Sequence, residues 1–307
     1  MSAKDQRVAV ITGGSQGIGA GLVTGYRGQG WAVVTSARTI EPSQDPDLLT
    51  LRGDAALPAT ADQIIHAALD RFGRIDTLVN NAGVFISKPF TDYTADDYSL
   101  ITGVNLGGFF WLTQRAITEM LNRSGGHVVN ITATVAEYAD SASPSVLTAL
   151  TKGGLAAATR SLAIEYASRG IRVNAVSPGI IQTPMHPASS YQDLGSQLPP
   201  IGRVGQVRDV VGAVLFLEAS PYITGEIVHV DGGQVAGHCP RAWCCNAPAS
   251  GLCQRRLLEE AWPVASRSGG SVWRGLNPLA SDDAPGRGNG QGLARARPPG
   301  PKAMLDT

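Results

Sequence analysis

Several features that would mark other classes of protein are missing from this sequence of 307 residues. Residues 1–238 hold no cysteine, which excludes a disulfide framework there. No apolar run approaches the roughly 18 residues that a membrane span needs, and the start, MSAKDQRVAVITGG, lacks a basic region followed by an apolar run and a cleavage site. Charged residues make up only 16% of the chain and cancel to a net charge of zero, which argues against nucleic-acid and membrane partners. We therefore expect a cytoplasmic globular protein.

Residues 239–307 differ in composition from the rest of the chain. They contain every cysteine, at positions Cys239, Cys244, Cys245 and Cys253, among many glycines, prolines and arginines. The C-x4-C-C-x7-C spacing lacks the paired C-x2-C units of zinc modules, so we expect no metal site. Because this stretch has no helical or strand period and few apolar residues, we expect a low-complexity, disordered extension after a single domain over residues 1–238.

Residues 1–238 alternate between short apolar runs and helical patterns. The expected strands are 7–12, 31–38, 48–54, 76–83, 126–132, 171–179 and 226–233. The expected helices lie between them, at about 15–30, 60–72, 94–123, 146–168 and 206–219. Since apolar residues fill the strand runs without alternating with polar ones, both faces of the sheet should be covered. The pattern predicts an α/β fold, a doubly wound seven-stranded parallel sheet with helices on both faces.

The first turn between a strand and a helix reads TGGSQGIG, from Thr12 to Gly19. In a doubly wound sheet, ligands bind outside the carboxyl ends of the strands, where this turn lies. Gly13 allows the tight turn, Gly17 lets backbone amides approach a phosphate, and Gly19 permits close packing of helix on strand. Any tight turn favours glycine, but this one follows a strand and opens a helix at the first turn of the alternation. It therefore predicts dinucleotide binding.

Five motifs in order together resemble the classical short-chain dehydrogenases/reductases. They are TGGSQGIG at 12–19, NNAG at 80–83, VN at 104–105, Lys152 in a TKGG helix, and SPGIIQTPM from Ser177. The resemblance covers residues 6–238 and ends with GEIVHVDGG. It implies one Rossmann-type domain that binds NAD(H) or NADP(H) and exchanges a hydride with a small or medium carbonyl or alcohol substrate. It also implies a homo-oligomer, a tetramer or dimer, built through the helices near 103–123 and 148–168.

The catalytic positions of this family are only partly retained. The resemblance gives Lys152 two tasks, to bind the nicotinamide ribose and to lower the pKa of a tyrosine one turn earlier. That position holds Thr148, whose aliphatic hydroxyl starts several pKa units above a phenol. The family's catalytic serine aligns with Ala133, which is flanked by threonines. Asn105 and Lys152 remain, so the sequence predicts an altered proton relay.

Several side chains are candidates for the missing proton donor. Thr134 or Thr148 could hydrogen-bond a substrate carbonyl while a water held by Asn105 and Lys152 supplies the proton. Tyr138 follows the fifth strand, on a segment that normally borders the substrate. Other residues lie on or near loops over the same strand ends: Glu137, His186 and Tyr191. Like Tyr138, each of them is more often plain loop surface.

The resemblance also supplies a set of cofactor-binding candidates. Asp54 matches a residue that contacts the adenine, Asn81 begins the floor under the adenosine, and Ile181 and Thr183 match groups that hold the carboxamide. Asp54 could instead cap a loop. The whole set is Gly13, Ser15, Gln16, Gly17, Ile18, Gly19, Arg38, Asp54, Ala55, Asn81, Ala82, Gly83, Lys152, Pro178, Gly179, Ile181 and Thr183.

The end of the second strand, TSARTI, bears on the choice of cofactor. An acidic residue there would bind the ribose 2′-hydroxyl and repel a 2′-phosphate, and none is present. Ser36 and Arg38 could accept the phosphate. We therefore favour NADP(H), with NAD(H) left open because Arg38 could be a solvated surface side chain.

Two functions remain compatible with the sequence. The first is an NADP(H)-dependent oxidoreductase with a non-standard proton relay. The second is a dinucleotide-binding protein with little turnover, acting as a sensor or partner subunit. Lys152 and Asn105 are compatible with both functions, because the resemblance also gives Lys152 the task of binding the nicotinamide ribose.

Overall fold

The computed structural model describes residues 6–123, 125–184 and 198–237. The predicted extension over 239–307 lies outside the described residues, with all four cysteines, and so do His186 and Tyr191. No helix among the described residues is long and apolar enough to cross a membrane.

A seven-stranded sheet forms the centre of the described part. Its strands are β1 (Val8–Thr12), β2 (Ala32–Ala37), β3 (Leu48–Arg52), β4 (Thr77–Asn80), β5 (Gly126–Ile131), β6 (Ile171–Pro178) and β9 (Ile227–Val230). They lie in the order β3-β2-β1-β4-β5-β6-β9, and every neighbouring pair is parallel. The order reverses between β1 and β4, which is the switch point of a doubly wound sheet. The predicted fold is confirmed.

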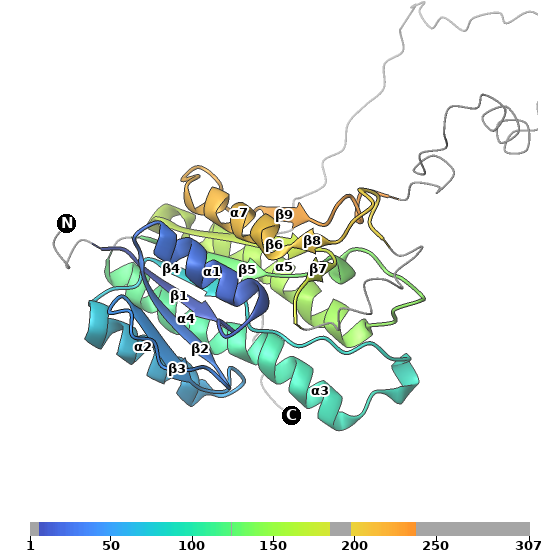
Figure 1. Cartoon of the computed structure of the whole chain (residues 1–307), viewed down its shortest axis with the longest axis horizontal. Coiled ribbons are helices and arrows are strands. Elements are labelled where there is room, and N and C mark those ends of the chain that lie inside the picture. Colours follow the sequence, from blue (N-terminus) through green and yellow to red (C-terminus); the bar gives the residue numbers. More distant parts are fainter. Residues whose placement is uncertain (1–5, 124, 185–197, 238–307) are drawn as a thin grey trace, which may run out of the picture. The chain divides into compact units, whose positions relative to one another are not determined.

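Helices cover both faces of the sheet (Figure 1). They are α1 (Gly17–Gly28), α2 (Pro58–Phe72), α3 (Ala95–Ile101), α4 (Gly108–Asn122), α5 (Val146–Tyr166) and α7 (Val207–Glu218). Helices α2, α4 and α5 pack on one face, while α1 and α7 pack on the other. With helices on both sides, a strand such as β1 is buried at every residue, which explains its unbroken apolar run.

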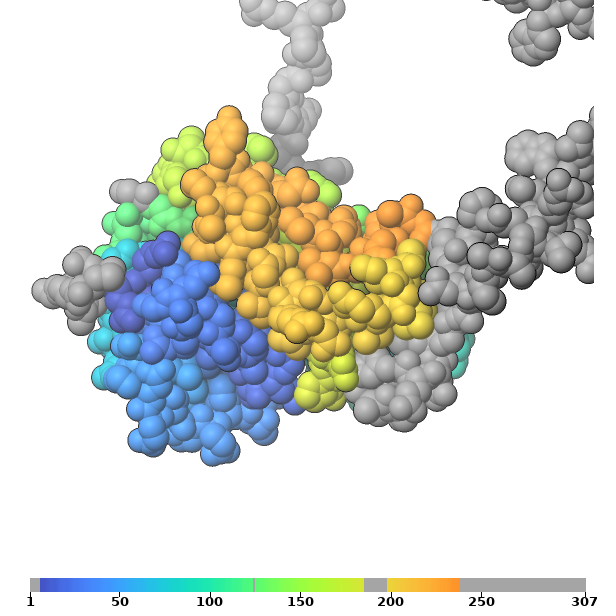
Figure 2. All heavy atoms as spheres, turned by 45° about the horizontal axis from the view of Figure 1, so that its top comes forward, coloured from blue at the N-terminus to red at the C-terminus, as the bar shows by residue number. Residues whose placement is uncertain are grey.

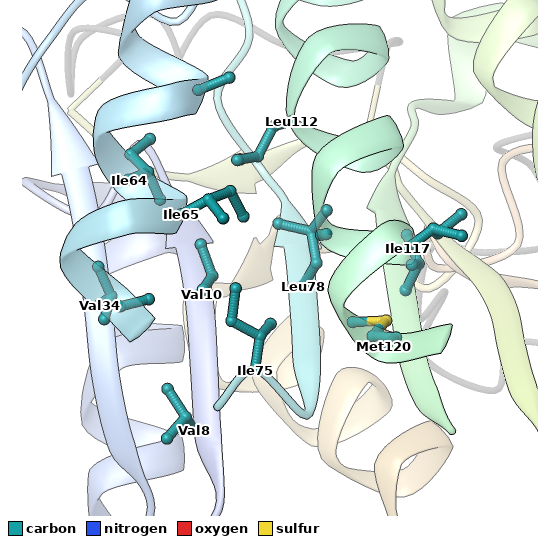
Figure 3. Close-up of a cluster of buried hydrophobic side chains, with 14 of the residues drawn as sticks. Val8, Val10, Val34, Ile64, Ile65, Ile75, Leu78, Leu112, Ile117 and Met120 are labelled. Carbon is teal, nitrogen blue, oxygen red and sulfur yellow. The ribbon is translucent and has the colours of Figure 1, made fainter. Parts of the chain in front are cut away.

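The core under α2 and α4 is a layer of interlocking aliphatic side chains (Figure 3). Val8 and Val10 of β1 belong to the same cluster as Ile64 of α2, and Leu78 of β4 lies between α2 and α4. All are nearly inaccessible to solvent. This packing holds the carboxyl ends of the strands in a fixed arrangement, which a ligand site at that edge requires.

On the opposite face, glycines let α1 and α7 approach closely. A Cβ at Gly21 would lie 2.2 Å from Cγ1 of Val207, and one at Gly25 would lie 2.7 Å from Cγ1 of Val211. Figure 2 shows the two helices side by side on the surface, α1 in dark blue and α7 in gold. The contact fixes the start of α1, which carries the glycine-rich turn.

The structure differs from the predicted elements in two places. The helix expected over 94–123 is broken into α3, a π-helical turn over Thr102–Gly107, and α4. At its end, the amide of Gly108, the first residue of α4, donates to the carbonyl of Gly103. A two-residue pair of strands, β7 (Ile181–Gln182) and β8 (Gly205–Gln206), was not predicted because so short a pairing leaves no periodic pattern.

Candidate active site

One large cavity, of about 520 Å³, lies along the carboxyl ends of the strands. It is lined by the segments that follow β1 to β6, so it straddles the switch point between β1 and β4. Every residue expected to bind the cofactor lines it, as do Thr134, Tyr138 and Thr148. Asn105 does not, and lines a small separate cavity beneath.

The glycine-rich turn is built for close backbone approach. Gly13 and Gly17 have φ angles of 72° and 56°, which L side chains rarely adopt. A Cβ at Gly19 would lie 2.1 Å from the carbonyl oxygen of Gly13. Helix α1 then begins at Gly17 with no side-chain cap and no acidic residue in its first turn. Its first amides are therefore free to bind an anion, which fits a phosphate at this point.

The turn after β4 is locked to the turn after β1. Thr12 Oγ1 accepts from the amides of Asn81 at 3.0 Å and Ala82 at 2.9 Å, and Asn81 Nδ2 donates to the Thr12 carbonyl at 2.8 Å. The asparagine motif therefore shapes the cavity floor through its own backbone. Asp54 also shapes its own turn, because its Oδ1 accepts from the amide of Ala56 at 3.0 Å. The residue lines the cavity as well.

The end of β2 carries Ser36 and Arg38 and no acidic side chain, as the sequence indicated. Ser36 is buried and its carbonyl accepts from the amide of Gly13 at 2.7 Å. Arg38 is exposed, lines the cavity and is the basic residue nearest this strand end in the sequence. The arrangement places a cation at the mouth of the cavity beyond β2.

Lys152 is a buried cation at the centre of the cavity wall. It lies on α5, only 7% exposed, and its Nζ donates to the carbonyl of Ile131 at 2.7 Å. A Cβ at Gly83 would lie 3.1 Å from Nζ, so the glycine leaves room for this side chain. Burial lowers the pKa of Lys152 to about 8, because the charged form loses its hydration. This ammonium can give up a proton near neutral pH.

The side chain of Asn105 forms its hydrogen bonds with other groups of the protein. Its Oδ1 accepts from the amide of Val84 at 2.9 Å, and its Nδ2 donates to the Val84 carbonyl and to Thr151 Oγ1, each at 3.1 Å. The side chain thereby ties the π-helical turn to α5 and to the segment after β4. That Asn105 holds a catalytic water stays a prediction.

Thr148 occupies the place one turn before Lys152. It is 2% exposed, lines the cavity, and its Oγ1 has no hydrogen-bond partner among the described residues. An unpaired buried hydroxyl costs folding free energy, roughly 1–3 kcal/mol. Such a group is suited to a polar ligand atom that enters the cavity.

The remaining candidates are arranged around the segment after β5. Thr134 Oγ1 donates to Oε1 of Gln234 at 3.3 Å, and Tyr138 lines the cavity. Glu137 pairs with His229 at 2.9 Å and does not line it. Ala133, at the expected serine position, does line the cavity and offers no hydroxyl.

Sequence reasoning missed several lining residues. Gln234 follows β9, and the rule that strand ends carry the site could have found it, since it comes directly after the VDGG motif. Asp140 and Ser143 belong to an irregular segment between β5 and α5 that gives no pattern. Phe85 follows the NNAG turn by two residues and was equally unmarked.

Comparisons with known proteins agree with this geometry. A family model described as enoyl-(acyl carrier protein) reductase matches residues 13–234. The 3-oxoacyl-(acyl-carrier-protein) reductase of Synechocystis sp. is 32% identical over 248 residues, covering 76% of this chain and 99% of that protein.

Two solved structures share the fold. ElxO with NADP bound has a TM-score of 0.69 at 28% identity, covering 76% of this chain and 100% of that chain. A short-chain type dehydrogenase/reductase from Mycobacterium marinum has a TM-score of 0.70 at 29% identity, covering 76% of this chain and 96% of that chain. With the glycine-rich turn, the buried lysine and a match over residues 13–234, the chain belongs to the short-chain dehydrogenase/reductase family.

Proposed function

We propose that the protein is an NADP(H)-dependent oxidoreductase acting on a small or medium carbonyl or alcohol. The observation that carries this proposal is the buried ammonium of Lys152 within a cavity that also contains the uncapped start of α1. One group can hold a ribose while the other holds a pyrophosphate. The bound NADP in ElxO supports the same use of the fold.

The residues present fit a phosphorylated dinucleotide. Gly17, at the start of α1, lines the cavity, and the nearest atoms to a Cβ placed on it belong to Thr183 and Pro184, at 3.4 Å or more. Arg38 would pair with the 2′-phosphate, with Ser36 beside it, and the end of β2 offers no acidic side chain to oppose the phosphate. Ile181 and Thr183 would hold the carboxamide.

The bound cofactor would supply the hydride, and this chain must supply the proton. Thr148 Oγ1 would hydrogen-bond the substrate oxygen, since it has no other partner among the described residues. Its own proton is too tightly held for a general acid. Lys152 lies one turn later on the same helix face, and its pKa of about 8 suits proton donation through Thr148 or a water.

Cofactor titration tests the binding part of this proposal. NADPH should bind saturably and more tightly than NADH, followed by the fluorescence of the reduced nicotinamide. Lys152→Ala should weaken NADPH binding, while Lys88→Ala, which removes a lysine outside the cavity, should leave it unchanged. Equal affinity for both cofactors in the unmodified protein would contradict the choice of NADP(H).

A second function, a dinucleotide-binding protein with little turnover, is favoured by the threonine at position 148. The two functions separate in one assay, the oxidation of NADPH with a panel of aldehydes and ketones. Reduction of any of them above the uncatalysed rate, and its loss in Lys152→Ala, supports the enzyme. Saturable NADPH binding with no reduction supports the sensor or partner subunit.

We also propose a homo-oligomer. Apolar side chains stand exposed on α4 and α5, with Phe110, Leu150 and Ile164 exposed by 50%, 60% and 81%. They lie on the two helices through which the family resemblance places the contact between subunits, and this supports the proposal. Sedimentation equilibrium should give a dimer or tetramer, and Leu150→Glu with Ile164→Glu should shift it toward the monomer.

A further inference from the structure

The part of the cavity beyond β5 has a distinct electrostatic character. Among the described residues that line the cavity, four carry charge: Arg38, Asp54, Lys152 and Asp140. The first two follow β2 and β3, and β2 lies three strand positions from β5, about 14 Å away. Lys152 Nζ donates to the carbonyl of Ile131, the last residue of β5, and lies beside Gly83, so its charge stands at the strand end where this part of the cavity begins. Asp140 is thus the charged side chain of the segment between β5 and α5 that faces this part of the cavity.

Asp140 has free capacity to bind a ligand. Its Oδ1 accepts from the amide of Ala142 at 2.9 Å, which shapes the local turn. A carboxylate has about four lone-pair positions, so one hydrogen bond leaves most of them available. The residue is half-buried, and no ion pair to it is recorded among the described residues.

A second group in the same cavity independently indicates a polar ligand. The buried Oγ1 of Thr148 has no partner among the described residues, so a ligand oxygen placed there would satisfy it. Thr134, Tyr138 and Gln234 also line this part of the cavity and add hydrogen-bonding groups without adding a cation. A ligand anchored at Thr148 would therefore have the ammonium of Lys152 one helical turn from its anchored end, and its other end would extend toward these polar side chains and Asp140.

We propose that Asp140 is the specificity-determining residue of the substrate site, selecting carbonyl compounds that carry a cationic group over those that carry a carboxylate. The proposal rests on the oxidoreductase function stated above. Its cause is charge complementarity, because an ammonium near Asp140 gains a charge-assisted contact while a carboxylate meets like charge. Neutral hydroxyl-bearing substrates should fall between the two.

The experiment uses three aryl methyl ketones that differ only at the para position, with a trimethylammoniomethyl, a hydroxymethyl or a carboxymethyl group. We expect kcat/KM with NADPH to be about tenfold or more higher for the cation than for the carboxylate. Asp140→Asn should abolish that preference, because asparagine keeps the oxygen that accepts from Ala142 but loses the charge. Asp96→Asn, which removes an exposed carboxylate of α3 that does not line the cavity, is the matched control and should leave the order unchanged.

Binding of the corresponding secondary alcohols separates this proposal from the proposed function. Alcohols cannot react with NADPH, so calorimetry with and without NADPH reports the charge preference even in a protein without turnover. Cation preference that is lost in Asp140→Asn supports the proposal whether or not the ketones are reduced. Equal or tighter binding of the carboxylate, a preference that survives Asp140→Asn, or no saturable binding of any of the three would overturn it. Failure of NADPH itself to bind would count against the proposed function alone.

Discussion

The two ends of the sheet use buried polar side chains in opposite ways. At the amino ends of the strands, Oε2 of Glu218 accepts from Tyr26 Oη at 3.1 Å, Thr77 Oγ1 at 2.9 Å and His127 Nδ1 at 3.0 Å. At the carboxyl ends, Thr148 Oγ1 has no partner among the described residues, and the cavity lies open beside it. One end is closed by its own hydrogen bonds, and the other leaves donors and acceptors for a ligand.

Buried polar side chains at the closed end are hydrogen-bonded to one another and to backbone carbonyls. His127 Nε2 accepts from Nδ2 of Asn174 at 3.1 Å, so the ring is neutral with its proton on Nδ1. Burial lowers the pKa of His127, which keeps the ring neutral. Arg172 donates to the carbonyl of Leu217 at 2.9 Å. The indole N–H of Trp31 is the exception near this end, without a partner among the described residues.

This difference separates stability from function along one sheet. Polar groups satisfied by protein contribute to folding, whereas polar groups left unsatisfied cost folding free energy and are retained where a ligand can satisfy them. Changes at the open end should therefore alter binding and turnover, and changes at the closed end should alter stability alone.

The largest expected effect is at the open end, in the variant that combines Thr148→Tyr with Ala133→Ser. It places a phenol one turn from Lys152 and a hydroxyl at the edge of the cavity. A general acid is typically worth roughly 100- to 10,000-fold, so carbonyl reduction with NADPH should rise by that order. The matched control, Thr148→Phe with Ala133→Ser, supplies the same ring without the acid and should give no gain. If the tyrosine variant binds NADPH yet reduces no faster than the control, Thr148 does not occupy the catalytic position.

At the closed end, Glu218→Ala should lower the free energy of unfolding by about 3 kcal/mol or more, because three buried donors lose their acceptor. Urea denaturation measures this loss. Glu218→Gln keeps an acceptor oxygen and should recover part of it. The dissociation constant for NADPH should stay unchanged in both variants, and a large change would show that the two ends are coupled.

Arg38→Asp tests the preference for NADPH over NADH at the open end. The new carboxylate would repel the 2′-phosphate, so we expect the dissociation constant for NADPH to rise by about tenfold or more and the preference over NADH to narrow or reverse. Arg52→Asp is the control, because Arg52 is an exposed arginine of β3 that does not line the cavity. A similar loss of NADPH affinity in both variants would indicate a general electrostatic effect instead of a contact with the 2′-phosphate.

The dependence of reduction on pH tests the proton source at the open end. Burial lowers the pKa of Lys152 to about 8, so the ammonium is present below that pH and is lost above it. With Lys152 as the proton source, kcat/KM for reduction should be level below about pH 8 and fall about tenfold per unit above it. A profile that stays level to pH 10 would place the proton source elsewhere.

Much of the fold and the cofactor part of the site followed from local patterns. Gly13 lies in a turn that strand and helix periodicity place at the carboxyl ends of the strands, and the family resemblance placed Lys152 in the same site. Both line the cavity. The contact between Glu218 and His127 joins residues 91 apart and has no sequence pattern. Asp140 lies in irregular chain, and the commitment of Asn105 to Val84 depends on a π-helical turn. These features arise from tertiary packing, which periodicity does not report.

The central claim is that this chain transfers a hydride from NADPH to a carbonyl although position 148 is a threonine. The direct measurement uses NADPH with deuterium at both positions of the nicotinamide C4, with mass spectrometry of the alcohol formed from an aryl methyl ketone. We predict deuterium on the carbinol carbon, accumulating slowly, much faster after Thr148→Tyr with Ala133→Ser, and not at all in Lys152→Ala. Saturable binding of NADPH by the unmodified protein with no deuterium in any product would contradict the account and favour the binding protein without turnover.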